Sequence, residues 1–393
     1  MYIRIIISAV VAILLVSCSK SSNTQASFHN DHTVFIDLKD APTRRWSEFL
    51  DNITVVGLVP LKTDNPLDEV RNIKNADGYL YISDKSKKLY SFDMSGQARF
   101  VINAHGRGRG EYIDLTDFCI HNDTIFILDR LTSRILCYSS KTGKYQSYIK
   151  IENTADYFGI AATDDGIYLL KSMFNYPFKQ NSYPLELINY SGKTQSNLLQ
   201  QSEWYIKQTE EYYWGGECCI YRLGDQTHLA IPFRNAIYEI ASSDSAYIKY
   251  RFDFGQNDID SHIDSPSAMS PANRSLTAID GGVVAETNEH IILYTTSEQA
   301  MSYLVYNKRS SRYDIFTHQI NGTYCLMRGD SYVYSINDSC FATLISPYKI
   351  TPLPHQITLE GFSDNIKSVY DELHSRDISS DDNPILMLFD IPF

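Results

Sequence analysis

The sequence predicts an all-β protein, a six-bladed β-propeller of four-stranded antiparallel blades with one C-terminal amphipathic helix inserted in the last blade. Three observations predict this fold. A short turn followed by an apolar strand recurs six times, a second series of tight turns alternates with the first, and the chain contains 29 Tyr and 18 Phe. Aromatic side chains favour strands because they pack well on a pleated, half-buried surface.

The composition is that of a globular protein with a large core. Of its 393 residues, 43% are hydrophobic and 21% are charged. The formal net charge of -12 argues against a nucleic-acid partner, because binding phosphates requires a basic face. We expect a monomer that binds no nucleic acid.

The N-terminus is predicted to be a lipoprotein signal peptide, residues 1–17. One basic residue, Arg4, precedes an apolar run that is too short to span a bilayer, which takes about 20 residues as a helix. The stretch Leu15-Val16-Ser17-Cys18 resembles the bacterial lipobox, in which the cysteine is lipidated. The alternative is an ordinary signal peptide followed by an incidental cysteine.

Residues 18–32 are small and polar and are predicted to form a flexible tether, so the propeller would occupy residues 33–393. Acyl chains on Cys18 would attach the protein to the cell envelope. Ser19, in place of an aspartate after that cysteine, favours the outer membrane. Whether the protein faces the periplasm or the outside stays open.

Six segments share one pattern, a turn of Asn, Asp or Gly followed by a strand rich in Ile, Leu, Tyr and Phe. They are NADGYLYISD (75–84), HNDTIFILD (121–129), TDDGIYLL (163–170), GDQTHLAIPF (224–233), TNEHIILYTT (287–296) and INDSCFATLI (336–345). Turn residues of these types suit the positive φ angles of tight hairpins. A repeat at intervals of about 42 to 63 residues is typical of a blade array.

A second series of turns at Gly96, Gly143 and Gly192 alternates with the first. Each unit is therefore expected to have four antiparallel strands, a to d, with tight a–b and c–d turns. Radial packing of such units hides their sheet edges. A pair of β-sandwiches is the alternative, but it does not explain six returns of one hairpin pattern.

The last unit predicts how the ring closes. Its third strand is NPILMLFDIPF, reached through a helix at about 363–376 that has Ser363 as its N-cap. Apolar residues four and three apart on this segment support the helix. The missing outer strand would come from the N-terminal side, from HTVFIDL (32–38) or NITVVGLVPLKT (52–63).

The cysteines are expected to be mostly buried free thiols. Cys119 on strand a and Cys137 on strand c of one blade would lie two strand spacings apart, about 9.5 Å, which is beyond the reach of a disulfide. Cys325 and Cys340 do not face each other across a turn. The adjacent pair Cys218-Cys219 is interpreted as packing rather than redox chemistry.

All the long insertions fall in the b–c and d–a connections, so one face should carry the binding loops. Aromatic residues are dense in them and could stack on a sugar or pack against a peptide: Tyr176, Phe178, Tyr183, Trp204, Tyr212, Tyr213 and Trp214. The alternative is that these rings plug the loops onto the rim as a hydrophobic cluster.

Cations on the same face could grip a carboxylate or sulfate: Arg107, Arg109, Arg130, Arg134, Arg234 and Lys171. The alternative is that they form salt bridges with Glu111, Asp129 and Glu217. Of these residues and the aromatic set, we select Arg107, Arg109, Arg234, Tyr176, Trp204, Tyr213 and Trp214 as the ligand-binding candidates.

Carboxylates near the starts of inner strands are weaker candidates, for a calcium site at the channel mouth: Asp68, Glu69, Asp114, Asp156 and Glu217. The segment NDIDSHID lacks the glycine of an EF-hand loop and is interpreted as a solvated acidic loop. No histidine cluster supports zinc, and no G-x-S-x-G motif supports a serine nucleophile.

The glycine-rich segment HGRGRGEY (105–112) lies between the first and second units. It lacks the G-K-[ST] of a phosphate-binding loop. Gly106, Gly108 and Gly110 are expected to serve the crossing from rim to axis, because it needs backbone angles that other residues resist. Whether its two arginines point to a ligand or to Glu111 stays open.

Residues 53–150 resemble the first blades of the bacterial six-bladed β-propeller lipoproteins, a family similar to NHL-repeat propellers. The strand VPLKT, the hairpin YISDKSKKLYSFDMSG, the loop GRGRGEY, the segment PFRNAIYEI (232–240) and the terminal NPILML carry the resemblance. The chain departs from it at Arg109, where the family usually has proline. The resemblance implies an envelope lipoprotein with a binding face and no settled activity.

Two functions follow as hypotheses. The first is a non-catalytic, lipid-anchored propeller without a cofactor that binds a glycan, peptide or partner protein on its loop-rich face. The second is a calcium-dependent hydrolase or lyase of the lactonase-like propeller type, which the resemblance implies.

Overall fold

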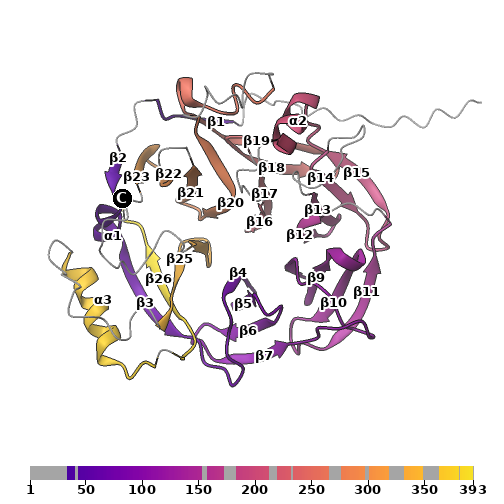
Figure 1. Cartoon of the computed structure of the whole chain (residues 1–393), viewed down its shortest axis with the longest axis horizontal. Coiled ribbons are helices and arrows are strands. Elements are labelled where there is room, and N and C mark those ends of the chain that lie inside the picture. The colour runs from indigo at the N-terminus through magenta and orange to yellow at the C-terminus, as the bar shows by residue number, and fades with distance from the viewer. Residues whose placement is uncertain are drawn as a thin grey trace, which may run out of the picture.

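The protein forms a ring of six β-sheets around a central axis, and each sheet is one blade (Figure 1). This is a computed structural model, and it describes residues 33–39, 43–152, 157–171, 183–211, 219–231, 233–264, 276–296, 301–317, 332–347, 363–379 and 381–392. The predicted fold class, six four-stranded antiparallel blades with a C-terminal helix, is confirmed.

The first three blades are built from consecutive strands that run from the axis outward. Blade 1 contains β4 (Val70–Ala76), β5 (Tyr79–Asp84), β6 (Leu89–Asp93) and β7 (Ala98–Ile102). Blade 2 contains β8 (Asp117–His121), β9 (Thr124–Asp129), β10 (Arg134–Ser139) and β11 (Tyr145–Lys150). Blade 3 contains β12 (Tyr157–Thr163), β13 (Gly166–Lys171), β14 (Leu185–Ile188) and β15 (Thr194–Leu198).

Blades 4 and 5 follow the same order and each gains a fifth strand. Blade 4 contains β16 (Cys219–Leu223), β17 (Gln226–Ala230), β18 (Ala236–Ser242) and β19 (Ser245–Asp253), with β1 (Val34–Asp37) parallel to β19. Blade 5 contains β20 (Ala278–Glu286), β21 (His290–Thr296), β22 (Met301–Asn307) and β23 (Arg312–Thr317), with β2 (Thr43–Arg45) parallel to β23. These added strands cover two outer edges that would otherwise expose unpaired backbone groups.

The two ends of the chain meet in blade 6. Its strands are β24 (Tyr334–Ser335), β25 (Phe341–Ile345), β26 (Ile385–Asp390) and, on the outside, β3 (Thr54–Pro60). β26 pairs antiparallel with β3, from Ile385 opposite Pro60 to Asp390 opposite Thr54. Of the two predicted sources of the closing strand, the segment 52–63 is therefore the one used.

All six predicted turn-and-strand segments form the a–b hairpins of the blades. Asp77 and Gly78 have φ angles of 54° and 75° in the first hairpin, and Asn122 and Asp123 have φ angles of 46° and 60° in the second. Two consecutive positive φ angles match the right-handed twist of the flanking strands. The choice of Asn, Asp and Gly at these positions therefore has a geometric cause.

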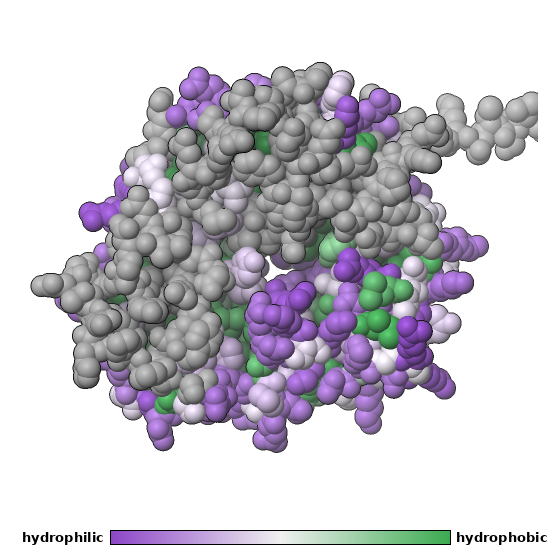
Figure 2. All heavy atoms as spheres, in the orientation of Figure 1, coloured by the Kyte–Doolittle hydropathy of each residue, from purple (hydrophilic) through white to green (hydrophobic). Residues whose placement is uncertain are grey.

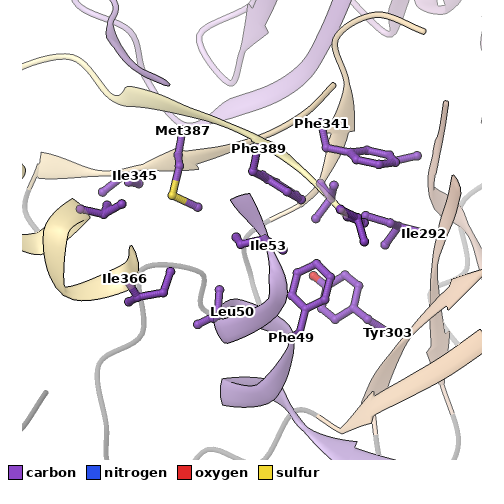
Figure 3. Packing of buried hydrophobic residues seen from close by; sticks show 14 of the residues in the cluster. Phe49, Leu50, Ile53, Ile292, Tyr303, Phe341, Ile345, Ile366, Met387 and Phe389 are labelled. Atoms are coloured by element: carbon purple, nitrogen blue, oxygen red, sulfur yellow. The ribbon is translucent and has the colours of Figure 1, made fainter. Parts of the chain in front are cut away.

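Two helices pack together on the outside of the last blades. α1 (Trp46–Asn52) precedes β3, and α3 (Asp364–Ser375) lies between β25 and β26. Figure 3 shows Phe49 and Leu50 of α1, and Ile53 directly after it, among buried side chains of blades 5 and 6, with Ile366 of α3 beside them. Ser363 caps α3 as predicted, because its hydroxyl accepts the N–H of Ile366.

Cys119 and Cys137 are buried free thiols on β8 and β10, as predicted. Burial raises the pKa of the Cys119 thiol to about 12, so it stays protonated. Cys340 is also a free thiol, whereas Cys218 and Cys325 lie outside the described residues.

The connections divide into two faces of the ring. The a–b and c–d turns are short throughout the described chain. The b–c and d–a connections carry η1 (Arg130–Thr132), α2 (Glu203–Glu211), η2 (Gly255–Asn257) and α3. We call the side from which these connections leave the loop-rich face. It is the side on which a site would be assembled from several blades.

Candidate functional site

The glycine-rich crossing from blade 1 to blade 2 is a tightly held loop on this face. Gly106 donates its N–H to the carbonyl of Tyr112 at 2.9 Å, and Tyr112 donates its own to the carbonyl of Ala104 at 3.0 Å. The buried Tyr112 ring places its hydroxyl 2.7 Å from the carbonyl of Lys87. Both ends of the loop are therefore fixed to blade 1.

At two of the three glycines, the missing side chain makes room for a carboxylate. Unusual backbone angles are therefore not the only reason for glycine in this loop. The Glu111 carboxylate accepts the N–H of Gly108 at 2.6 Å. A Cβ atom on Gly106 would lie 2.1 Å from that carboxylate, and one on Gly108 would lie 2.9 Å from it. Gly110 has a φ of +76° and faces the ring of Tyr145. The glycines therefore serve the crossing in a second way, because Gly106 and Gly108 leave space for the Glu111 side chain.

The structure answers where the arginines of this loop point. Within the described residues, Arg107 and Arg109 are exposed and pair with no carboxylate, because Glu111 is turned inward onto the loop backbone. Gly110, which follows Arg109, packs against the ring of Tyr145, the first residue of the outermost strand of blade 2. The C-terminal part of the loop is therefore beside the outer strand of blade 2.

Arg234, the third predicted cationic candidate, is held in a network of its own. Its guanidinium donates to Asp260 at 2.7 Å, to Asp264 at 2.9 and 3.0 Å, and to Gln201 at 2.8 Å. It also lies 4.7 Å above the ring of Tyr205. This network ties the b–c connection of blade 4 to α2 and to the acidic segment NDIDSHID, so an external ligand would have to displace these partners.

The other predicted cations are also paired. Arg130 lies 3.3 Å from Asp114, Arg134 lies 3.6 Å from Asp129, and Lys171 lies 2.9 Å from Glu186. These three cations are therefore salt-bridged, but only Arg134 has a partner that the alternative named, Asp129.

The described metal candidates lie in separate ion pairs. Glu69 is exposed and lies 3.0 Å from Lys85, whereas Asp114 is shared between Arg130 and Lys87. Asp68 accepts a hydrogen bond from Ser86. Among the described residues, no three His, Cys, Asp or Glu side chains converge as metal ligands would. Asp156 and Glu217 lie outside the described residues.

Two of the predicted aromatic candidates, Trp204 and Tyr183, lie in the described residues, and Trp204 is the exposed one of the two. It lies near the start of α2, is 39% exposed, and has the Lys207 ammonium 5.2 Å from its ring. Tyr183 is buried and donates its hydroxyl to Gln200 at 3.2 Å. The remaining aromatic candidates lie outside the described residues: Tyr176, Phe178, Tyr212, Tyr213 and Trp214.

Two buried carboxylates that sequence reasoning missed hold the connections of this face. Asp84 ends β5 and accepts the N–H of Asp68 at 3.1 Å, and Asp129 ends β9 and accepts the N–H of Ile113 at 3.0 Å. Each carboxylate fixes the segment that leads into the inner strand of its own blade. The matching ends of YISD and FILD in the repeats are the signal that could have found them.

Arg71 is a second residue that sequence reasoning missed. Val70 pairs with Asp84 and Asn72 with Ser83, so Arg71 is the extra residue of a β-bulge. It is exposed although β4 is the innermost strand of its blade. Bulges often re-aim a side chain beside a site. Figure 2 shows hydrophilic side chains gathered over blades 1 and 2 beside the centre of the ring.

Fold and face together define a six-bladed β-propeller whose long connections leave from one side. Residues 34–390 match the family described as Domain of unknown function (DUF4934), so the chain belongs to this family. No curated protein matches the chain.

Two solved structures from Bacteroides are similar. One is a protein of Bacteroides fragilis NCTC 9343 that is named as an exported protein by inference. It aligns with a TM-score of 0.68 and 18% identity, and the alignment covers 92% of this chain and 100% of the other chain. A member of the DUF4221 family from Bacteroides vulgatus ATCC 8482 aligns with a TM-score of 0.48 and 9% identity, covering 87% and 98%. The first shows a shared fold, and the likeness to NHL-repeat propellers stays a prediction.

Within the described ranges, no helix is both long and apolar enough to cross a lipid bilayer.

Proposed function

We propose that the protein is a lipid-anchored protein of the cell envelope that binds a glycan, a peptide or a partner protein on its loop-rich face without catalysis. The observation that carries this proposal is the division of the connections. Every described connection on one side is a short turn, whereas the other side carries η1, α2, η2 and the α3 insertion. A rigid ring that presents varied loops on one side suits recognition.

The chemistry of the described loops supports binding rather than a reaction. The carboxylates Glu69 and Asp114 are neutralised by separate cations, and Asp129 accepts backbone hydrogen bonds. Exposed groups on the same face, Trp204 and Arg107, can stack on or pair with a ligand. The name of the similar Bacteroides fragilis protein agrees with an envelope location, and the lipobox-like segment supplies the anchor at Cys18.

The anchor is tested by feeding cells an alkyne-labelled palmitate. The wild-type chain should become labelled and float with the outer membrane, and C18S should lose both properties. Labelling of C18S equal to that of the wild type would contradict the anchor.

The binding face is tested with the purified chain from residue 19 onward on a glycan array and in pull-downs from envelope extracts. Binding of a hit should weaken in Trp204→Ala and stay unchanged in Tyr190→Ala. Tyr190 is a matched control because it is 43% exposed in a c–d turn on the opposite face. A large stabilisation by calcium that a chelator reverses would instead favour the metal-dependent enzyme.

A further inference from the structure

The exposed arginines of the described chain fall into two groups. Four of them pair with a carboxylate: Arg44 with Asp314, Arg45 with Glu48, Arg222 with Asp225 and Arg309 with Glu289. Within the described residues, the exposed arginines that pair with none are Arg71, Arg107, Arg109 and Arg312. In a protein with a net charge of -12, cations without a carboxylate need a reason.

Three of these four arginines lie on the loop-rich face of blade 1 and the crossing after it. Arg71 is the second residue of β4, which begins at that face, and Arg107 and Arg109 belong to the d–a crossing. Arg312 begins β23 of blade 5, so it lies on another blade, away from this crossing. The grouping is therefore confined to blade 1 and the crossing after it.

The carboxylates near the three arginines already have other partners. Glu111 accepts the N–H of Gly108, and Glu69 pairs with Lys85. Asp68 accepts hydrogen bonds from the Ser86 hydroxyl at 2.7 Å and from the N–H of Glu69 at 2.8 Å. These hydrogen bonds hold the pKa of Asp68 below its usual value, so it stays an occupied acceptor. The local negative charge is thus turned away from the arginines.

The three arginines extend from the axis toward the rim. Arg71 lies on the innermost strand of blade 1, whereas Gly110, next to Arg109, packs against Tyr145 of the outermost strand of blade 2. Four strands separated by about 4.8 Å make a sheet about 14 Å wide from first to last. Cations spread from an inner to an outer strand suit a polymer with a repeating acidic group better than one small anion.

We propose that the loop-rich face binds an acidic polysaccharide, whose carboxylate or sulfate groups lie along Arg71, Arg107 and Arg109. This inference rests on the proposed function and names the class of its ligand. The guanidinium group matches both anions because its donors form a planar fork. Exposed Trp204 on the same face favours a sugar polymer over an acidic peptide, since a flat ring can pack against a sugar face.

The test measures binding of three polymers to the purified chain by biolayer interferometry. They are polygalacturonate for carboxylates, dextran sulfate for sulfates and unmodified dextran as the neutral polymer. We expect at least one acidic polymer to bind, with an affinity that falls as salt is added, and dextran not to bind. The triple variant R71Q/R107Q/R109Q should bind at least about tenfold more weakly. Arg312→Gln, which removes an exposed arginine from blade 5, should bind as the wild type does.

Three results would overturn the inference: no binding of either acidic polymer, equal binding by the triple variant, or an equal loss in R312Q. All three substitutions are at exposed positions, and a thermal melt checks that the variants fold. A neutral glycan or a protein that binds the loop-rich face of the triple variant normally would leave the proposed function standing and refute this ligand class. Poly-glutamate binding tighter than both polysaccharides would assign the face to an acidic peptide instead.

Discussion

Two glycines, one on the crossing between blades 1 and 2 and one in the first a–b hairpin, differ in why their positions require glycine. At Gly110 two constraints coincide, a φ of +76° and a ring carbon of Tyr145 that would lie 2.7 Å from an added Cβ. At Gly78, in the first a–b hairpin, φ is +75° but no atom lies within 4 Å of such a Cβ. The two sites separate backbone strain from steric clash.

Replacing Gly110 with alanine should therefore cost more stability than replacing Gly78. We expect about 1 kcal/mol for G78A, from the left-handed backbone alone. We expect about 2 to 3 kcal/mol for G110A, because the Tyr145 ring must also move. The midpoint of urea unfolding measures the stability loss in both variants. Equal losses would show that the Tyr145 ring can move at little energetic cost.

Glu286, the last residue of β20, is a buried acid that joins blades 4 and 5. It accepts hydrogen bonds from Tyr221 at 2.7 Å and His228 at 2.8 Å on blade 4, and from Lys308 of blade 5 at 2.5 Å. Burial favours its neutral form, but His228 and Lys308 outweigh it and hold the pKa of Glu286 below its usual 4.5. The charged form is therefore the one that stabilises the fold.

Glu286→Gln should lower the free energy of unfolding by about 3 kcal/mol at neutral pH, because it leaves the partly buried Lys308 ammonium without its anion. A depressed folded-state pKa stabilises the protein above the unfolded pKa, and this contribution is lost as pH falls through the folded value. The gap between wild type and E286Q should thus be full near pH 7 and narrow below about pH 4.5.

Glu289→Gln is the matched control, three residues further on. Its ion pair with Arg309 is exposed, with 50% of the glutamate side chain and 81% of the arginine side chain accessible. It should cost less than about 0.5 kcal/mol at any pH. Denaturant unfolding at several pH values measures both variants, and a gap for E286Q that does not change with pH would refute the charged state.

Among the elements, the hairpins were predictable and the added edge pieces were not. Each a–b hairpin combines a turn residue that tolerates positive φ with an apolar strand, so local sequence defines it. β2 is three exposed residues, Thr43–Arg45, and shows no pattern of its own. β1 lies in HTVFIDL, which was predicted as a strand, but its place at the edge of blade 4 was not predicted. Their structure comes from pairing with β19 and β23, more than 200 residues away.

The candidate site shows the same limit. The loop-rich face could be predicted, because insertion lengths reveal it. The state of each side chain could not, because its partners are distant in sequence. Arg234 meets Asp264, 30 residues away, whereas adjacent Glu111 turns away from Arg107 and Arg109. The bulge at Arg71 depends on how two strands pair, and the residue types at these positions do not predict that register.

α3 offers a test of a predicted helix boundary. The Ser363 hydroxyl accepts the N–H of Ile366 at 3.4 Å, whereas the Ser375 hydroxyl near the other end donates to the carbonyl of Glu372 at 2.7 Å. Ser363→Ala should cost about 1 kcal/mol, because an N–H of the first turn loses its partner. Ser375→Ala should cost less than about 0.5 kcal/mol. Chemical denaturation compares the two, and a larger loss in S375A would contradict the cap.

For the whole molecule, stability should depend on the closing strand far more than on the added fifth strands. Deleting residues 33–45 removes β1 and β2 but leaves each blade with its four strands. Deleting residues 33–62 also removes α1 and β3, which opens blade 6, takes Phe49 out of the core and exposes the residues that packed against it, such as Phe389.

We expect the shorter deletion to keep one cooperative thermal transition at a lower Tm and the longer deletion to lose it. Circular dichroism melts measure both. Cooperative unfolding of the longer deletion near the wild-type Tm would show that the ring does not need its closing strand.

The pairing of β3 with β26 also sets the order of events in time. β3 ends at Pro60 and β26 begins at Ile385, so the ribosome makes the outer strand of blade 6 long before its partner exists. Until then β3 has no neighbour in its sheet, and the first five blades form an open arc with bare surfaces at both ends. Closure of the ring must therefore wait for β26, and an unfinished chain is exposed to proteases and chaperones until that strand arrives.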